Sequence, residues 1–355
     1  MTSTAAPSDI AGVVARLTEV RRAGLAWLLS RIDDDGTPVG ASDNNSWYRL
    51  PWTLAIAGHR EAGAAVLSWV ERNALTASGD LRTGPAQIPW VTEEASYPLA
   101  NLAIGAWHLE RFDTALPIMD TLRSYQDEST GGSFMERPDH RIHGRQGLMC
   151  TAQLGLTALT TGQRDVADGA YRWVKALYDA QPDLPRRLYV TWVDGGLMTA
   201  IPPELAFRSV IEFDKPRQAF FNPGIGAMFL SRYAMATGSE DARRIARALL
   251  QLSEDGTEAQ YDYPDTVHVG KFGWGAAAML DIEPLEKHLR NVIRMSNWYA
   301  DTQLEDGSWV PSRFLCPKPN DSDALWKTAE HLLVISYVLA ALRAYPRPIR
   351  AASNG

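Results

Sequence analysis

The sequence predicts an all-α protein built as a single (α/α)6 toroid, a barrel of helical hairpins with an inner and an outer ring. Two observations lead to this fold class. Segments that are apolar on nearly every side alternate with amphipathic ones. Glycine-containing turns recur at a spacing of roughly 55 residues, which suits one helical hairpin with its loops. A closed ring with the apolar helices inside satisfies both patterns, whereas an open solenoid would not leave so many helices uniformly apolar.

The clearest turn is the stretch 303–309, which lies between two helical segments. Gly307 suits the left-handed conformation that often ends a helix, and we expect Trp309 to pack back against the helix before it. The segment 325–345 follows, apolar nearly all round from Leu332 onward, and is therefore expected to be buried. The other glycine turns are expected near Gly36, Gly79, Gly131, Gly195 and Gly256.

The remaining helices follow the same alternation along the chain. Amphipathic segments, expected in the outer ring, are 9–31, 60–75, 112–126, 164–180, 239–254 and 283–303. Apolar segments, expected in the inner ring, are 47–57, 94–110, 146–161, 220–233, 267–282 and 325–345. Residues 182–216 are richer in proline and predict an elongated loop, which leaves open whether this loop is a lid. We expect one toroid domain over 9–347, between disordered termini at 1–8 and 348–355.

The composition of the 355-residue chain limits the classes of partner that we expect. Its net charge of -7 argues against nucleic acid as the main partner, which would require a basic face. No segment approaches the roughly 18 uninterrupted apolar residues of a membrane span, and the N-terminus shows no apolar signal core. Two cysteines, Cys150 and Cys316, do not form a disulfide framework, so we expect a cytoplasmic protein. A small-molecule substrate is the expected partner, and an oligomer is compatible with the sequence.

Several motifs carry a family resemblance. Gln303-x-x-x-Gly307-x-Trp309 resembles the glutamine–tryptophan repeat of squalene–hopene-type terpene cyclases, with similar residues at 126–134 and a fainter copy at Asp35-Gly36. Residues 318–328 resemble the last segment of protein prenyltransferase β subunits. Both families share the α6/α6 toroid, so the resemblance implies a central cavity that opens at the N-terminal ends of the inner helices. The chain lacks the Asp-x-Asp-Asp acid motif of the cyclases, and Lys327 falls where the prenyltransferases have a zinc-ligand histidine.

If the inner helices begin at the mouth of the cavity, their first turns hold the functional site. Burial there would raise the pKa of a carboxylic acid and allow it to act as a general acid. The candidate catalytic residues are Asp43, Glu94, His143, His268, Lys327 and Glu330. The candidate substrate-binding residues are Trp47, Tyr48, Tyr97, Cys150, Phe221, Tyr261, Trp274, Trp326 and His331.

Each candidate also has a purely structural interpretation. Cys150 is a common type of core filler, and His143, between two arginines, fits an ordinary loop. Glu94 beside Glu93 can simply complement a helix dipole. Tryptophans are found in cores more often than in cavity walls, although aromatic faces stabilise cations and stack on sugars.

The sequence predicts no cofactor and no metal. His143, Cys150, His268, Cys316 and His331 lack the spacing of a zinc site, and no dinucleotide or phosphate-binding loop is present.

Three functions remain. The first is a cofactor-independent lyase, isomerase or cyclase that applies acid–base chemistry to an apolar, isoprenoid-like or polyketide-like molecule in an aromatic cavity. The second is a glycoside hydrolase or carbohydrate lyase that uses paired carboxylates, Asp43 with Glu94 or Asp262 with Glu330. The third is a non-catalytic toroid that binds a ligand or a partner protein.

Overall fold

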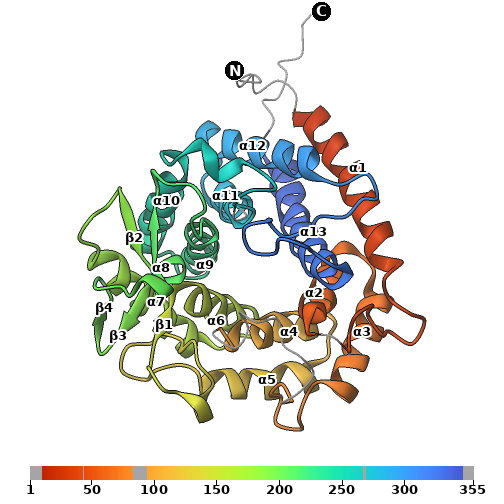
Figure 1. Ribbon diagram of the computed structural model, residues 1–355, viewed down its shortest axis with the longest axis horizontal. Coiled ribbons are helices and arrows are strands. Elements are labelled where there is room, and N and C mark those ends of the chain that lie inside the picture. The colour runs from red at the N-terminus through yellow and green to blue at the C-terminus, as the bar shows by residue number, and fades with distance from the viewer. Residues whose placement is uncertain (1–9, 43, 83–93, 267–268, 347–355) are drawn as a thin grey trace, which may run out of the picture.

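The helices of this protein form two concentric rings (Figure 1). The computed structural model describes residues 10–42, 44–82, 94–266 and 269–346. The outer ring consists of α1 (Ile10–Leu29), α3 (Arg60–Asn73), α5 (Phe112–Arg123), α7 (Arg164–Asp179), α10 (Glu240–Glu254) and α12 (Glu286–Thr302). The inner ring consists of α2 (Leu50–Ala57), α4 (Ser96–His108), α6 (Leu148–Thr160), α9 (Phe221–Thr237), α11 (Lys271–Ile282) and α13 (Asp321–Ala344). The predicted all-α toroid is confirmed.

Burial follows the two patterns read from the sequence. In α4 every residue from Ser96 to Ala106 is buried, because its neighbours in the inner ring and α5 together surround it. In α10 the buried side chains include Ala242, Ile245, Ala246 and Leu249, which recur at helical spacing on one face. The inner helices therefore form the core of the molecule, and the outer helices cover it.

Neighbouring inner helices contact one another around the whole ring, in the order α2, α4, α6, α9, α11, α13 and back to α2. Each outer helix packs on the inner helices beside it, and α1 packs against both α12 and α13. The last hairpin thus closes on the first part of the chain, which makes a ring (Figure 1).

Glycine turns that follow α1, α3, α5 and α12 pack against the next outer helix of the ring. Gly307, after α12, has a φ of 93°, and a Cβ there would lie 2.7 Å from the carbonyl oxygen of Ala23 on α1. Gly131, after α5, has a φ of 84° and approaches the backbone of Gly169 on α7 in the same way. Only glycine allows both this conformation and this approach.

The two glutamines that begin these turns make equivalent contacts. The Nε2 of Gln303 donates to the carbonyl oxygens of Val20 and Gly307, at 2.8 and 2.9 Å. The Nε2 of Gln126 donates in the same way to Val166 and Gly131, both at 2.9 Å. The side chain of each glutamine therefore ties its own turn to the following outer helix.

The aromatic residue of the motif is confirmed in one copy and corrected in the other. Trp309 is buried, and its Nε1 donates to the carbonyl oxygen of Tyr299 on α12 at 3.2 Å. Its backbone N–H donates to Thr328 Oγ1, just as the N–H of Ser133 donates to Thr151 Oγ1. Ser133, not Phe134, therefore stands at the equivalent position in the second copy.

Two predicted turns are not equivalent to the others. Gly195 lies between two short strands, β3 (Thr191–Val193) and β4 (Gly196–Leu197), and nothing lies within 4 Å of where its Cβ would be. Gly256 does not adopt a positive φ. The repeat is therefore regular over its first three turns and at the closing turn, and irregular between them.

The proline-rich segment 182–216 forms small structure of its own. It contains β2 (Arg187–Tyr189), β3, β4, α8 (Ala206–Ser209) and β5 (Val210–Glu212). β2 pairs with β5, and β3 pairs with both β4 and β1 (Gln146–Gly147), all antiparallel. The pairing with β1 places this segment beside the start of α6.

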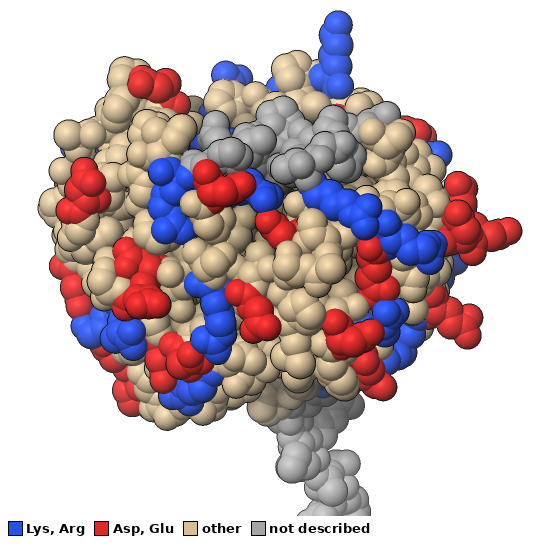
Figure 2. Space-filling view, turned by 90° about the horizontal axis from the view of Figure 1, so that it is seen from below, with Lys and Arg blue, Asp and Glu red and all other residues tan. Residues whose placement is uncertain are grey.

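The surface and one long helix bear on possible partners. Figure 2 shows acidic and basic side chains interspersed over the side of the molecule that it presents. Within the described residues, α13 has the length and hydropathy of a membrane span, but 78% of its most apolar stretch is buried inside the toroid. Its apolar character is thus explained by its place in the inner ring.

Candidate functional site

The N-terminal ends of the inner helices converge on a buried cluster of charged side chains. Arg49 ends the 3₁₀ turn Ser46–Arg49 that leads into α2, and Lys271 begins α11. Lys327 and Glu330 lie in the second and third turns of α13. The exposed fractions of Arg49, Lys271, Lys327 and Glu330 are 1%, 6%, 3% and 5%. Charged side chains are rarely this buried unless they are paired or functional.

Glu330 is the carboxylate at the centre of this cluster. Arg49 Nη1 and Lys327 Nζ each lie 3.3 Å from the same oxygen, Oε2 of Glu330. Arg49 Nη2 also donates to the hydroxyl of Tyr97 on α4, at 2.9 Å. Lys271 has no carboxylate partner within 4.0 Å among the described residues; its Nζ lies 3.6 Å from the thioether sulfur of Met149.

Aromatic rings surround the three cations. Lys327 Nζ lies 4.4 Å from the centroid of the Trp326 ring, and the Arg49 guanidinium lies 4.6 Å from that of Tyr48. Lys271 Nζ lies 4.7 Å from the ring of Phe221 and 5.0 Å from that of Tyr97. These cation–π contacts partly replace the hydration that the cations lose on burial.

Burial and the neighbouring charges shift the pKa values of Glu330 and Lys327. Burial alone would raise the pKa of Glu330, but Lys327, Arg49 and Lys271 hold it well below its usual range. Burial lowers the pKa of Lys327 to about 8; Glu330 opposes this shift, and Arg49 and Lys271 add to it. Near neutral pH Glu330 is therefore ionised, and an appreciable fraction of Lys327 is the free amine.

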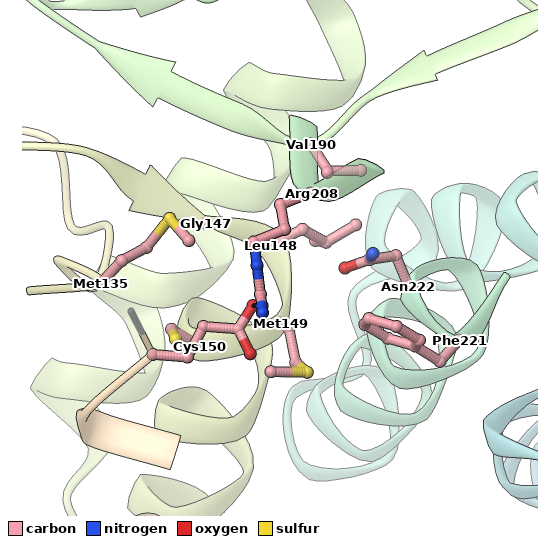
Figure 3. A pocket seen from close by; sticks show the side chains of 10 residues that line it. Met135, Gly147, Leu148, Met149, Cys150, Val190, Arg208, Phe221 and Asn222 are labelled. Atoms are coloured by element: carbon pink, nitrogen blue, oxygen red, sulfur yellow. Dashed lines mark ion pairs between the residues drawn. The ribbon is translucent and has the colours of Figure 1, made fainter. Parts of the chain in front are cut away.

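A pocket lies beside the cluster, and Figure 3 shows the side chains that line it. Met149 of α6 and Phe221 of α9 line it, and both also contact Lys271. Arg208 of α8 reaches into it from the segment 182–216 (Figure 3). This pocket has room for roughly one water molecule.

Glu94 and Cys150 also line this pocket. Glu94 is buried, and its Oε1 lies 3.5 Å from Arg208 Nη1. Burial, and to a smaller degree Glu94, raise the pKa of the Cys150 thiol far above its usual value. A thiol with a raised pKa is a poor nucleophile, so Cys150 is best described as part of the pocket wall.

His331, next to Glu330 in the chain, is buried beside the charged cluster, whereas Trp274 is buried among aromatic rings. The His331 ring packs edge-on against Trp298, Tyr299 and Trp309, with centroids 5.4–5.5 Å apart. Burial, with Lys327 nearby, lowers the pKa of His331 to about 3, so its ring is neutral. Trp274 packs on Trp52 of α2 and Tyr337 of α13 and belongs to the core.

The structure does not bring two other candidates to the cluster. His143 is exposed on the loop before β1, and it is the backbone N–H of His143 that donates to Glu136. Tyr261 is half-buried against the guanidinium of Arg294, an outer-ring residue of α12. Both predictions relied on proximity in sequence to an inner helix, which does not determine the direction in which a loop side chain points.

The structure does not pair Asp262 with Glu330, as one of the predicted carboxylate pairs would require. Asp262 is exposed whereas Glu330 is buried, so these two do not form a buried pair. Asp43, the proposed partner of Glu94, and His268 lie outside the described residues.

The aromatic candidates Trp47, Tyr48 and Tyr97 are fully buried. Tyr48 accepts a hydrogen bond from the Trp326 indole N–H at 3.0 Å, whereas Trp47 packs on Trp69.

Sequence reasoning missed Arg49 and Lys271 as site residues. Each is a single basic residue in an otherwise apolar stretch at the start of an inner helix, 47–57 and 269–280. That isolation was an available signal, because a charge in such a stretch must be buried with the helix. Over the described residues, no group of three or more His, Cys, Asp or Glu side chains is placed to hold a metal ion, and both cysteines are free thiols.

Comparisons with known proteins identify the fold. No protein-family profile matches the sequence, and no curated protein matches it. Among solved structures, the GH76A α-1,6-mannanase from Salegentibacter sp. is similar with a TM-score of 0.64 and 12% identity, over 92% of this chain and 99% of that one. A D-mannose isomerase is similar with a TM-score of 0.65 and 12% identity, over 96% of this chain and 99% of that one. The type II terpene cyclase MstE from Scytonema is similar with a TM-score of 0.59 and 11% identity, over 93% of this chain and 99% of that one. At these identities the likeness establishes a shared α/α toroid, in agreement with the resemblance noted in the sequence.

Proposed function

We propose that this protein is an enzyme, a lyase or isomerase that transfers a proton next to a carbonyl group of a small molecule bound at the centre of the toroid. The observation that carries the proposal is the buried Arg49–Glu330–Lys327 cluster, in which the pKa of Lys327 is lowered to about 8. A base with a pKa near the working pH is well suited to proton transfer. That the reaction needs no cofactor, and that it takes place in the cytoplasm, stay predictions from the sequence.

Each group has a role in this reaction. The free amine of Lys327 takes a proton from the carbon beside the carbonyl and returns it elsewhere on the product. The ionised Glu330 orients the amine, because its Oε2 lies 3.3 Å from Lys327 Nζ. The positive charges of Arg49 and Lys271 nearby make it easier for negative charge to develop on the carbonyl oxygen, which is the costly part of such a reaction.

The pocket has room for about one water, so a substrate must displace side chains as it enters. Met149 is the most suitable to move, because an unbranched thioether side chain adapts easily to a new shape. We therefore expect the site to open around Met149 and Phe221 when substrate binds.

Carbocation cyclisation of an isoprenoid is less well supported than carbonyl chemistry. Aromatic walls help a cyclase when their faces are turned toward a substrate cation. Here the rings of Tyr48, Phe221 and Trp326 already face the protein's own cations. A carbocation close to Arg49, Lys271 and Lys327 would be repelled. Of the two substrate types expected from the sequence, a carbonyl-bearing, polyketide-like molecule fits better.

A carbohydrate substrate is the second candidate, and a specific observation favours it. Glu94 and Glu330 are both buried at the N-terminal ends of inner helices, and the same fold serves a mannanase and a mannose isomerase. Sugar isomerisation is itself proton transfer beside a carbonyl and would use Lys327 in the same way. Glycoside hydrolysis would instead require one carboxylic acid to stay protonated, which the low pKa of Glu330 opposes.

The test is incorporation of solvent deuterium. Purified protein is incubated in D2O with panels of aliphatic and aryl ketones, ketoses and aldoses, against enzyme-free blanks, and the products are examined by mass spectrometry. If the protein transfers protons, compounds of one panel take up deuterium. A sugar or ketone whose exchange rate saturates with its concentration identifies the substrate class.

The matched variants are Lys327→Arg and Lys215→Arg. Arginine keeps the positive charge beside Glu330 but cannot lose its proton, so Lys327→Arg should abolish the exchange. Lys215 is an exposed residue paired with Glu212, and its replacement should have no effect. Exchange that persists at the normal rate in Lys327→Arg, or no exchange with any panel, would refute the proposal and leave the non-catalytic ligand-binding toroid as the better description.

A further inference from the structure

We infer that the central site binds an oxyanion, a carboxylate or phosphate group carried by the substrate, at Lys271 and Arg49. This inference builds on the proposed function, because it names the charge that the substrate brings to the site. It depends on geometry: the arrangement of buried cations around one carboxylate.

The site contains more buried cations than carboxylates. Among the described residues around the pocket and cluster, the cations are Arg49, Lys271, Lys327 and Arg208, and the carboxylates are Glu330 and Glu94. Arg208 pairs with Glu94, and Glu330 is shared by Arg49 and Lys327. Lys271 has no carboxylate partner in the described parts of the chain. A cation held away from water without a counter-ion is unfavourable, so an anion from outside the chain would bind there favourably.

Hydrogen-bond donors are also available. The Nη1 of Arg49 is buried and makes no hydrogen bond within the described structure, although it lies 3.3 Å from Glu330. The Nζ of Lys271 has three N–H donors, and among the described residues only a thioether sulfur, a weak acceptor, lies within bonding distance. Both cations lie against the same ring, that of Tyr97, at 5.3 and 5.0 Å from its centroid. Both cations therefore lie beside one ring, close to the same part of the site.

The helices add to the same field. Lys271 is the first residue of α11, Tyr97 lies in the first turn of α4 and Phe221 is the first residue of α9. The N-terminal end of a helix carries a partial positive charge. Several such ends point toward one place, where they reinforce the attraction of Lys271 and Arg49 for an anion.

The first experiment uses probes of matched shape with the wild-type protein. Thermal unfolding is followed with benzoate, benzamide, phenyl phosphate and inorganic phosphate at constant ionic strength. Benzoate and benzamide have similar size, but only benzoate carries a charge. We expect saturable stabilisation by benzoate or by the phosphates and none by benzamide; the better anion identifies the group. Equal effects of benzoate and benzamide, or no saturable effect of any anion, would overturn the inference.

The second experiment uses Lys271→Met, with Lys215→Met as the surface control. Loss of one charged partner should weaken anion binding roughly 30-fold or more, whereas Lys215→Met should leave it unchanged. The ligand-free Lys271→Met protein should melt no lower than wild type, because the substitution removes an uncompensated buried charge. If Lys271 has a structural role alone, this variant melts lower and binds the anion as before. If Lys271→Met does not fold, Lys271→Arg should still bind, and the benzoate–benzamide comparison still decides.

The two hypotheses can fail separately. Anion binding that depends on Lys271, combined with normal deuterium exchange in Lys327→Arg, refutes the proposed function and leaves this inference standing. Deuterium exchange that depends on Lys327 but is equally fast for neutral and anionic substrates refutes the anion inference and supports the proposed function.

Discussion

The Nζ atom of Lys327 lies 3.3 Å from Oε2 of Glu330, one turn further along the same helix, and both side chains are buried. A buried pair of this kind is costly to break, because removal of one partner leaves the other charge without compensation. The pair is therefore the point at which stability and the proposed chemistry meet.

Glu330→Gln should destabilise the protein by about 3–5 kcal/mol, because Arg49 and Lys327 then lack their shared carboxylate. The double variant Glu330→Gln with Lys327→Met should recover part of this loss, since it removes one of the two stranded cations. Urea unfolding of the wild type, of Glu330→Gln, of Lys327→Met and of the double variant gives the interaction free energy between the two side chains. A double variant no more stable than Glu330→Gln would mean that the charges of Glu330 and Lys327 do not interact.

The proposed reaction should depend on pH through Lys327. Its pKa is lowered to about 8, and only the free amine accepts a proton. The rate with a given substrate should therefore rise as pH increases through about 8 and level off above it. Stopped-flow or mass-spectrometric exchange rates between pH 6 and pH 10 provide the measurement. A rate that is constant over this range, or that falls, would assign proton transfer to another group.

Acid should destabilise the fold through His331. Its pKa is lowered from 6.5 to about 3 in the folded state, so between these values the unfolded chain binds a proton that the folded protein does not. The free energy of unfolding should fall as pH decreases through this window, by up to about 1.4 kcal/mol per pH unit. His288, whose pKa burial also lowers, adds to the same trend.

His331→Phe tests this assignment, because phenylalanine keeps the edge-on packing against Trp298, Tyr299 and Trp309 and cannot be protonated. Denaturant unfolding at several pH values from 4 to 7 should give a shallower dependence in the variant than in wild type. Identical slopes would show that His331 does not contribute to acid sensitivity.

Gly307→Ala and Gly58→Ala form a matched comparison. Both glycines have a positive φ, 93° and 91°. An alanine at Gly58 meets nothing within 4 Å, whereas at Gly307 its Cβ would lie 2.7 Å from the carbonyl oxygen of Ala23. Gly58→Ala should cost about 1–2 kcal/mol from backbone strain alone, and Gly307→Ala about 3 kcal/mol or more. Equal losses in thermal or urea unfolding would mean that the approach of this turn to α1 is not tight.

Much of the fold could be predicted from the sequence, because the two helix classes differ in pattern. The predicted segment 164–180 corresponds to α7 at Arg164–Asp179, and 283–303 to α12 at Glu286–Thr302. The turn motif at Gln303 was also informative, since glutamine, glycine and tryptophan each make a specific contact there. The strands within 182–216 were not predicted, because they are too short for an alternating pattern to be recognised.

The candidate site was predicted less well. The first turns of the inner helices do converge, and Lys327 and Glu330 lie together. Arg49 and Lys271 belong to no recognisable motif, and the position of His143 beside an inner-helix segment does not bring its side chain to the site. Which side chains share a counter-ion depends on packing between helices far apart in the chain, such as α2 and α13. Sequence periodicity gives the face of a helix but not its partner across the ring.

The closing turn at Gly307, which ties α12 to α1, changes how the molecule should come apart. An open array of repeats frays from its two ends, because each terminal repeat has only one neighbour. In this protein α1 and α13 pack together, so no hairpin is terminal. Hydrogen exchange should therefore reveal one cooperative opening of the whole ring, with similar protection in α2 and α11, in place of a gradient from the ends to the middle.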